Sequence, residues 1–318
     1  MNSSYEQLGA LVEHRIQQWI GTLPTTGLYA PMAYIMELPA KRVRPVAMLM
    51  ASEMFGRDPK NVVDVAVGLE LFHNFTLMHD DVMDKAPLRR GQATVHTRWN
   101  VNSAILSGDA MLVKAYELIG TAPEVLPMFN HHALGVCEGQ QLDMDFEERL
   151  DVTTADYMRM IHAKTALLLG CAFGMGAVLG GAGEEERDRM IRFGERIGLA
   201  FQLKDDLLDA FGDPQRMGKQ LGGDLRAGKK TWLLIRGLEL SAERSDPRLR
   251  EQLERTPEQR DVELMRSILS SMEVPAASRQ LIRELEMEAI ALLDALPVME
   301  ERKEPLRRLA QRLKERVY

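Results

Sequence analysis

The stretch His79-Asp80-Asp81-Val82-Met83-Asp84 places three carboxylates at the end of an apolar run over residues 62–78. On a helix, residues four apart lie one turn above each other, so Asp80 and Asp84 share a face and Asp81 flanks them. Their mutual repulsion disappears when hard divalent cations bind, and Mg²⁺ favours one or two carboxylates together with substrate phosphate oxygens and water. For a single motif of this kind, a solvated helix end is the slightly better explanation.

The same spacing returns 125 residues later, in Phe201-Gln202-Leu203-Lys204-Asp205-Asp206-Leu207-Leu208-Asp209. This copy also follows an apolar helical run, over residues 197–201. Two identical acidic triplets, each at the end of an apolar helix, are hard to explain as solvent-exposed residues without a function. If the two helices face each other, six carboxylates converge and can hold metal ions on both sides of one anionic ligand.

Basic residues recur beside both acidic triplets, which favours an anionic ligand over a set of solvated surface charges. Arginine presents a planar fork that suits phosphate oxygens, whereas lysine acts as a point charge. The basic stretches are residues 41–45, residues 89–91 and a loop with Lys219, Arg226, Lys229 and Lys230.

The composition indicates a globular, helical protein. Of 318 residues, 45% are hydrophobic and 27% charged, and the net charge of −7 argues against a protein that coats nucleic acid. Only 6% are aromatic while methionine is plentiful, which favours helices over strands. Length alone suggests about two domains, but there is no low-complexity linker or repeat, so we expect one domain over residues 1–318.

Prolines divide the chain into expected helices, because proline usually starts or ends a helix. None occurs over residues 128–213, which predicts several long helices, whereas residues 212–231 contain five glycines and five basic residues and predict a mobile loop. From about residue 248 onward we expect shorter helices, interrupted at prolines 257, 275, 297 and 305.

Residues 166–182 form an unbroken run of apolar residues and glycines, just short of a membrane span. Five glycines and the length favour a buried core helix, so no transmembrane segment is expected. Only two cysteines, Cys137 and Cys171, in a chain of this length favour a reducing compartment, and because neither is in a paired ligand spacing no structural zinc site is expected. Because no cationic start followed by an apolar stretch opens the chain, no secretory signal is expected and the predicted location is cytoplasmic.

Over residues 28–234 the sequence resembles the trans-isoprenyl diphosphate synthases, the polyprenyl synthetases that include farnesyl and geranylgeranyl diphosphate synthases. The GGKRxRP segment of that family appears as Pro39-Ala40-Lys41-Arg42-Val43-Arg44-Pro45, its HDDxxD…RRG motif as residues 79–91, and its FQxxDDxxD motif as residues 201–209. Its KT pair matches Lys164-Thr165, its GQ-x-x-D helix residues 139–143, and its GK…GDLxxGK loop residues 218–229. The clear departure is Pro39-Ala40, where the family usually has two glycines.

The resemblance implies an all-α helical bundle around a deep central cavity, usually a homodimer. It implies head-to-tail condensation of isopentenyl diphosphate with an allylic diphosphate, with three Mg²⁺ per active site. The implied metal ligands are Asp80, Asp81, Asp84, Asp205 and Asp209. The implied contacts to the allylic diphosphate are Arg89, Lys164, Gln202, Lys219 and Lys229, and those to isopentenyl diphosphate are Lys41, Arg44, His73 and Arg90. The residues expected to carry the chemistry are Asp80, Asp81, Lys164, Thr165, Gln202 and Asp205.

In this family the residues four and five before the first aspartate set the floor of the cavity, and here they are Thr76 and Phe75. The aromatic ring of Phe75 is expected to block long chains while Thr76 leaves room beside it. The resemblance therefore implies a short product of twenty carbons, with fifteen carbons as the next candidate. A helical wheel places Thr76 almost directly below Asp80 and Phe75 further round, which supports the role of Phe75 less firmly.

Three other functions use similar residues. A metal-dependent phosphohydrolase needs further histidine ligands besides His79, and the seven histidines form no such set. A terpene cyclase usually lacks the second full DDxxD motif and the KRxRP segment. A non-catalytic partner subunit of a synthase tends to lose aspartates, and all six are present.

Overall fold

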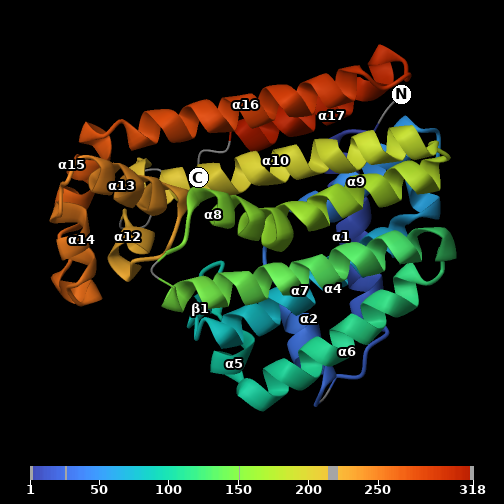
Figure 1. The fold of residues 1–318 in the computed structure, drawn as a ribbon. Helices are drawn as coiled ribbons and strands as arrows, with labels where there is room; N and C mark the ends of the chain where they lie inside the picture. Colours follow the sequence, from blue (N-terminus) through green and yellow to red (C-terminus); the bar gives the residue numbers. More distant parts are fainter. Residues whose placement is uncertain (1–2, 26, 150, 214–220, 316–318) are drawn as a thin grey trace. The chain divides into compact units, whose positions relative to one another are not determined.

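The computed structural model describes residues 3–25, 27–149, 151–213 and 221–315, and these residues are predominantly helical (Figure 1). The first helices are α1 (Tyr5–Gly21), α2 (Tyr29–Glu37), α3 (Val43–Met54), α4 (Val63–Met83), α5 (Val95–Arg98), α6 (Val101–Ile119) and α7 (Leu126–Glu148). The next are α8 (Thr154–Ile161), the π-helix η3 (His162–Ala166), α9 (Leu167–Gly180) and α10 (Glu184–Phe211). The last are α12 (Gly223–Ala227), α13 (Trp232–Glu243), α14 (Arg248–Leu253), α15 (Val262–Ser271), α16 (Val274–Asp294) and α17 (Glu300–Lys314). The predicted all-α fold is confirmed.

Short elements complete the described chain. The 3₁₀ turns are η1 (Pro59–Asn61), η2 (Pro123–Val125) and η4 (Pro257–Gln259), each beginning at a proline. Strands β1 (Leu88–Arg89) and β2 (Gln92–Ala93) pair antiparallel as a small hairpin, with Leu88 opposite Ala93 and Arg89 opposite Gln92.

Two compact units make up the chain. The first comprises residues 1–131, 171–191 and 296–309, and the second comprises residues 132–170, 192–295 and 310–318. Four of the five boundaries between these units fall inside helices α7, α9, α10 and α17, and the fifth, between residues 295 and 296, lies between α16 and α17. One domain over residues 1–318 therefore stays a prediction.

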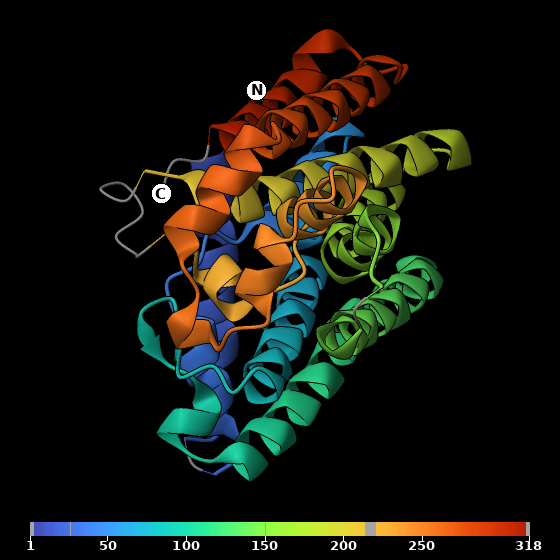
Figure 2. The ribbon, with the colours of Figure 1, turned by 60° about the vertical axis from the view of Figure 1, so that its left-hand side comes forward.

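In the first unit, α4 is the central helix and contacts α1, α2, α3 and α6 (Figures 1 and 2). Its N-terminal two thirds are apolar on most sides, as expected of a helix surrounded by others. Gly68 permits a close approach of α6, because a Cβ atom there would lie 2.8 Å from the side chain of Ile119 and 3.0 Å from the carbonyl oxygen of Ala115. The acidic motif of residues 79–84 ends this buried helix, as the sequence predicted.

Helix α9 contains most of the apolar stretch that resembled a membrane span. In the described part of the chain, the segment Thr154–Gly180 has the length and hydropathy of a span, and 61% of its most apolar window is buried. Gly176 and Gly180 face helix α3, where added Cβ atoms would lie 2.2 Å from the carbonyl oxygen of Met48 and 2.8 Å from that of Ser52. Such close backbone contacts require glycine, so they explain the glycine content of α9. They also support the interpretation of this stretch as a buried core helix.

The second unit is built around α13, which contacts α8, α14, α15 and α16. Its core includes Tyr157, Leu203, Leu234, Met265 and Ile268. The short helices α12 to α15 lie together, in orange, in both views (Figures 1 and 2).

Two expectations about chain breaks need correction. Pro305 lies inside α17, in its second turn, so the helix is not interrupted there, contrary to the expectation. Part of the predicted mobile loop, residues 223–227, forms helix α12, which begins and ends at the left-handed glycines Gly222 and Gly228. Residues 214–220 of that loop lie outside the described chain.

The packing of α9 on α3 predicts that Gly176→Ala destabilises the protein. The added methyl group meets backbone atoms of Met48, which cannot move without displacing α3, and overpacking of this kind typically costs about 1–3 kcal/mol. Urea unfolding measures the change. Gly9→Ala is the matched control, because Gly9 lies in α1 with nothing within 4 Å of its Cβ position. Alanine favours helix more than glycine does, so the free energy of unfolding of this variant should be unchanged or higher. Equal stability of the two variants would contradict the interpretation.

Candidate active site

The first acidic motif divides into one buried carboxylate and two more exposed ones. Asp81 is only 2% exposed, and both its carboxylate oxygens accept hydrogen bonds from Arg89 Nε, at 2.9 and 2.8 Å. Burial raises the pKa of Asp81, and the hydrogen bonds from Arg89 oppose that rise. Asp80 lies 3.5 Å from Arg89 Nη2, and Asp84 follows one turn later at the end of α4. Asp81 thus anchors the motif, while Asp80 and Asp84 lie closer to the protein surface.

The β1–β2 hairpin explains the Arg89-Arg90-Gly91 sequence. Arg90 and Gly91 both have positive φ angles, 54° and 76°, as the two central residues of a type I′ turn require. Arg89 therefore sits in the strand, where it reaches Asp81, and Arg90 occupies the turn. Gly91 supplies one of the two left-handed residues that this turn requires.

Four basic side chains, Lys41, Arg44, Arg89 and Arg90, lie in the same unit as the first motif and, together with His73, form what we call the cation cluster. Arg44 Nη1 lies 3.0 Å from His73 Nε2, and because arginine only donates, this imidazole nitrogen accepts. Burial, and then the charges of Arg44 and Arg90, hold the pKa of His73 well below its usual value. Among the described residues, Arg44 Nε is buried without a hydrogen-bond partner. A neutral histidine among arginines, one with an unmatched donor, is suited to receiving an anion.

The second acidic motif, in the second unit, repeats the arrangement of the first. Asp206 is 5% exposed; it accepts hydrogen bonds from the hydroxyl of Tyr157 and, at 3.0 Å, from Gln202 Nε2. Burial raises the pKa of Asp206 to about 7. Asp205 and Asp209 lie one turn apart on α10, and Asp209 Oδ2 accepts a hydrogen bond of 2.9 Å from the backbone of Asp224. The middle aspartate is again the anchored one.

Lys164 and Thr165 lie in the π-helix η3, an element that is rare and often found at functional sites. Thr165 Oγ1 donates to Gln202 Oε1 at 3.2 Å, and Lys164 Nζ donates to Asp143 Oδ2 at 2.6 Å. Two glycines allow neighbouring helices to approach this turn. A Cβ atom at Gly139 of α7 would lie 2.3 Å from the backbone nitrogen of Lys164, and one at Gly198 of α10 would lie 2.6 Å from the Cα of Ala166.

The predicted residues thus fall into two groups, one in each unit. The first unit contains Lys41, Arg44, His73, Phe75, Thr76, Asp80, Asp81, Asp84, Arg89 and Arg90. The second contains Lys164, Thr165, Gln202, Asp205, Asp209 and Lys229. Lys219 lies outside the described residues.

Further residues take part in these groups that motif reasoning did not assign. Asp143 pairs with Lys164, and the charge of Lys229 opposes the burial that raises the pKa of Asp224. Both aspartates stand inside quoted motifs, at residues 139–143 and 218–229, so a signal existed. Tyr157, which bonds Asp206, had no such signal because an isolated tyrosine in a helix is ordinarily a core residue.

Phe75 and Thr76 lie on α4 beneath the first motif. The ring centroid of Phe75 lies 5.6 Å from that of Phe72 and 4.8 Å from the imidazole of His79. His79 Nε2 lies 3.1 Å from the carbonyl oxygen of Ile105, where it acts as a donor.

The carboxylates of the two motifs suit a metal ion that is bound jointly by the protein and by substrate phosphate. Among the described residues, no three His, Cys, Asp or Glu side chains are grouped as a preformed metal site. Mg²⁺ is typically held by one or two carboxylates, several waters and substrate phosphates, and each motif offers carboxylates one turn apart. The residues present therefore fit Mg²⁺ that arrives with a diphosphate better than a resident structural metal.

A protein-family model, Polyprenyl synthetase, matches residues 25–272 of this chain. The chain belongs to the polyprenyl synthetase family. The expected family, and with it a trans-prenyltransferase, is confirmed.

Relatives of this polyprenyl synthetase include the short chain isoprenyl diphosphate synthase of Methanothermobacter thermautotrophicus, 38% identical over 75% of each chain. The geranylfarnesyl diphosphate synthase of Natronomonas pharaonis is 35% identical over 74% of this chain and 76% of its own. A crystal structure of a geranylgeranyl pyrophosphate synthase superposes with a TM-score of 0.93 at 38% identity, covering both chains completely.

The packing around η3 predicts that Gly139→Ala impairs this polyprenyl synthetase. The new methyl group would press on the backbone of Lys164 and displace Lys164 and Thr165, so we expect a loss of at least about tenfold in kcat. Gly135→Ala, one turn earlier on α7, is the matched control, because its methyl group meets only the end of the flexible Leu167 side chain. Steady-state kinetics and thermal unfolding of both variants test this. Equal activity of the two variants would argue against the role of Gly139.

Proposed function

We propose that this polyprenyl synthetase condenses isopentenyl diphosphate with an allylic diphosphate head to tail and releases diphosphate. Geranylgeranyl diphosphate is the proposed product, with farnesyl diphosphate as the shorter candidate. The observation that carries the proposal is the pairing, within one unit, of the Asp80–Asp84 carboxylates with a cation cluster around Arg44 and His73. The carboxylates can bind metal ions and the cations can bind phosphate oxygens, so the site suits a diphosphate substrate that binds together with a metal ion.

Mg²⁺, three ions per active site, is the proposed cofactor, and its ligands are Asp80, Asp81, Asp84, Asp205 and Asp209. When bound, these ions neutralise charge on the allylic diphosphate as it leaves. Asp80, Asp84, Asp205 and Asp209 are the better placed of the ligands, because Asp81 is buried against Arg89.

The two diphosphates are assigned to different cations. Isopentenyl diphosphate is held by Lys41, Arg44, His73 and Arg90. The allylic diphosphate is contacted by Arg89, Lys164, Gln202, Lys219 and Lys229. Arginine suits these roles because its fork can donate two parallel hydrogen bonds to phosphate oxygens.

The chemistry is electrostatic and needs no side chain to donate or accept a proton. The allylic C–O bond breaks, the π electrons of isopentenyl diphosphate form the new C–C bond, and the proton lost from that unit passes to the released diphosphate. Oxygen dipoles stabilise the intermediate cation: the hydroxyl of Thr165, the amide of Gln202 and the carbonyl of Lys164. The hydrogen bond from Thr165 to Gln202, and that from Gln202 to Asp206, hold this amide in one orientation.

A homodimer is the proposed assembly, and the cytoplasm the proposed location. Helix α6 supports a protein partner, because it exposes an unusual number of large apolar residues in the first unit. These residues are Val101, Ile105, Leu106, Val113 and Tyr116. The free thiols Cys137 and Cys171 suit a reducing compartment.

An incubation with labelled isopentenyl diphosphate and allylic diphosphates of five, ten and fifteen carbons tests the function. We expect a twenty-carbon diphosphate in the presence of Mg²⁺ and none after chelation with EDTA, because the carboxylates and the diphosphate then repel each other. Chromatography of the dephosphorylated products gives the chain length. Release of diphosphate without a longer chain would instead indicate a cyclase or a hydrolase.

The chain-length role of Phe75 has its own test. Phe75→Ala should lengthen the product beyond twenty carbons, because it removes the ring that lies beside Phe72 and His79 under the first motif. Phe75→Tyr retains the ring and should leave the product unchanged. An unaltered product profile for Phe75→Ala would exclude Phe75 as the block.

A further inference from the structure

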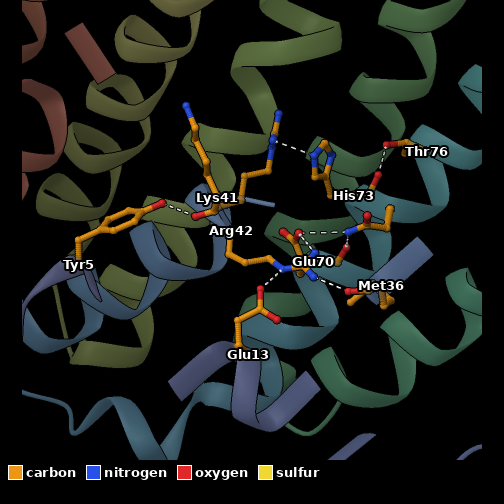
Figure 3. A network of polar contacts seen from close by, with 10 residues as sticks. Tyr5, Glu13, Met36, Lys41, Arg42, Glu70, His73 and Thr76 are labelled. Atoms are coloured by element: carbon orange, nitrogen blue, oxygen red, sulfur yellow. Dashed lines mark hydrogen bonds and ion pairs between the residues drawn. The ribbon is translucent and has the colours of Figure 1, made fainter. Parts of the chain in front are cut away.

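Helix α1 lies outside the residues matched by the family model, which begin at residue 25, yet two of its side chains reach the loop that carries Lys41 and leads into α3, where Arg44 lies. The hydroxyl of Tyr5 donates a hydrogen bond to the backbone carbonyl of Lys41. Glu13 accepts one of 2.7 Å from Arg42 Nε. Figure 3 shows both contacts, with Tyr5 and Glu13 reaching the loop at successive residues.

Arg42 differs from its two basic neighbours in this loop. Its side chain is 2% exposed, and its donors bind Glu13, the Glu70 carboxylate at 2.9 Å and the carbonyl oxygen of Met36. Asn74 Nδ2 also donates to Glu70, at 3.1 Å. With all these acceptors provided by the protein, Arg42 is a structural cation and is not suited to binding substrate.

The backbone at Arg42 directs the side chains of the loop to opposite sides. Its φ and ψ angles, 47° and 40°, are left-handed, a conformation that is strained for a residue with a side chain. Arg42 points down toward Glu13 and Glu70, whereas Lys41 points away from them (Figure 3). The buried contacts of Arg42 hold this strained turn and thereby set the direction of Lys41.

The loop also lacks the flexibility that two glycines would provide. Pro39 keeps Leu38 extended, with φ and ψ of −60° and 137°, and Ala40 follows it. The anchors of the turn are then Tyr5, Glu13, Met36 and Glu70, of which the first two belong to α1. Leu8, Val12, Ile16 and Trp19 form one buried stripe of α1 in its own unit, and Tyr5 continues that stripe toward the helix N-terminus, so the anchors lie on a packed helix.

We propose that α1 is a positioning element of the isopentenyl diphosphate site, acting through the Tyr5 contact to Lys41 and the Glu13 contact to Arg42. The assignment of that ligand rests on the proposed function. Neither Tyr5 nor Glu13 touches the substrate; they fix the turn from which Lys41 and Arg44 extend. Loss of these contacts lets the turn relax, and the cations then sample positions that do not match the diphosphate.

The test compares the double variant Tyr5→Phe/Glu13→Ala with wild type in steady-state kinetics. We expect the KM for isopentenyl diphosphate to rise about 3- to 10-fold, the effect of one or two lost hydrogen bonds, while kcat and the KM for the allylic diphosphate change less than about twofold. Glu13→Gln, which retains an acceptor for Arg42, should remain near wild type. Arg15→Ala is the matched control, because it removes a different ion pair of α1, that with Asp64 on α4.

A purely structural role for α1 would move the parameters of both substrates together, or would affect Arg15→Ala as much as the double variant. Either result, or an unchanged KM for isopentenyl diphosphate, would overturn the proposal. Thermal unfolding of all variants identifies those that fail to fold, and for these the single variant Tyr5→Phe, which removes one hydroxyl, provides the kinetic comparison.

Calorimetric titration with inorganic diphosphate, without added metal, separates this proposal from the proposed function. If the wild-type enzyme does not elongate a prenyl chain, the proposed function is wrong. The affinity of the cation cluster for diphosphate still tests whether α1 positions these side chains. The loss of one or two hydrogen bonds should weaken the affinity of the double variant about 3- to 10-fold, whereas the affinity of Arg15→Ala should be unchanged. This result would support the positioning role of α1. Equal affinities in all three proteins would overturn it.

Discussion

A carboxylate buried away from water destabilises a protein unless hydrogen bonds or an opposite charge replace the lost solvation, and both acidic motifs are arranged around that requirement. In each motif the middle aspartate is the buried one. Arg89 satisfies Asp81, and Tyr157 with Gln202 satisfies Asp206. The outer carboxylates are spaced one turn apart by the helix itself. The two motifs reach the same arrangement with different partners, a cation in one and neutral groups in the other.

Close approach between backbones is the second requirement of the fold. Gly176 permits α9 to lie against α3, and Gly139 and Gly198 permit two helices to lie against the π-helix that carries Lys164 and Thr165. A π-helix has a wider turn than an α-helix, so its backbone protrudes toward its neighbours. Glycines opposite it supply the room. The position of Lys164 and Thr165 thus depends on residues that have no side chain.

Similar residues in the sequence take different roles once their neighbours are known. Lys41, Arg42 and Arg44 form one basic stretch, but Arg42 is buried among Glu13, Glu70 and Met36. The acceptors come from α1, α2 and α4, which are distant in sequence from one another. No local pattern could have indicated that the central arginine is the structural one. Tyr157 is a comparable case, since its partner Asp206 lies 49 residues away.

Local patterns by themselves determined that the chain is helical, that two acidic triplets end apolar helices, and which family it resembles, because helical spacing and motif chemistry depend only on nearby residues. The apolar stretch of residues 166–182 was also interpreted correctly, since its glycines indicated helix packing. Only the tertiary structure decided which aspartate of each triplet is buried, which basic residue is already paired, and that Lys164 lies on a π-helix. Burial and pairing depend on groups that folding brings together from distant parts of the chain, and the sequence near each residue carries no record of them.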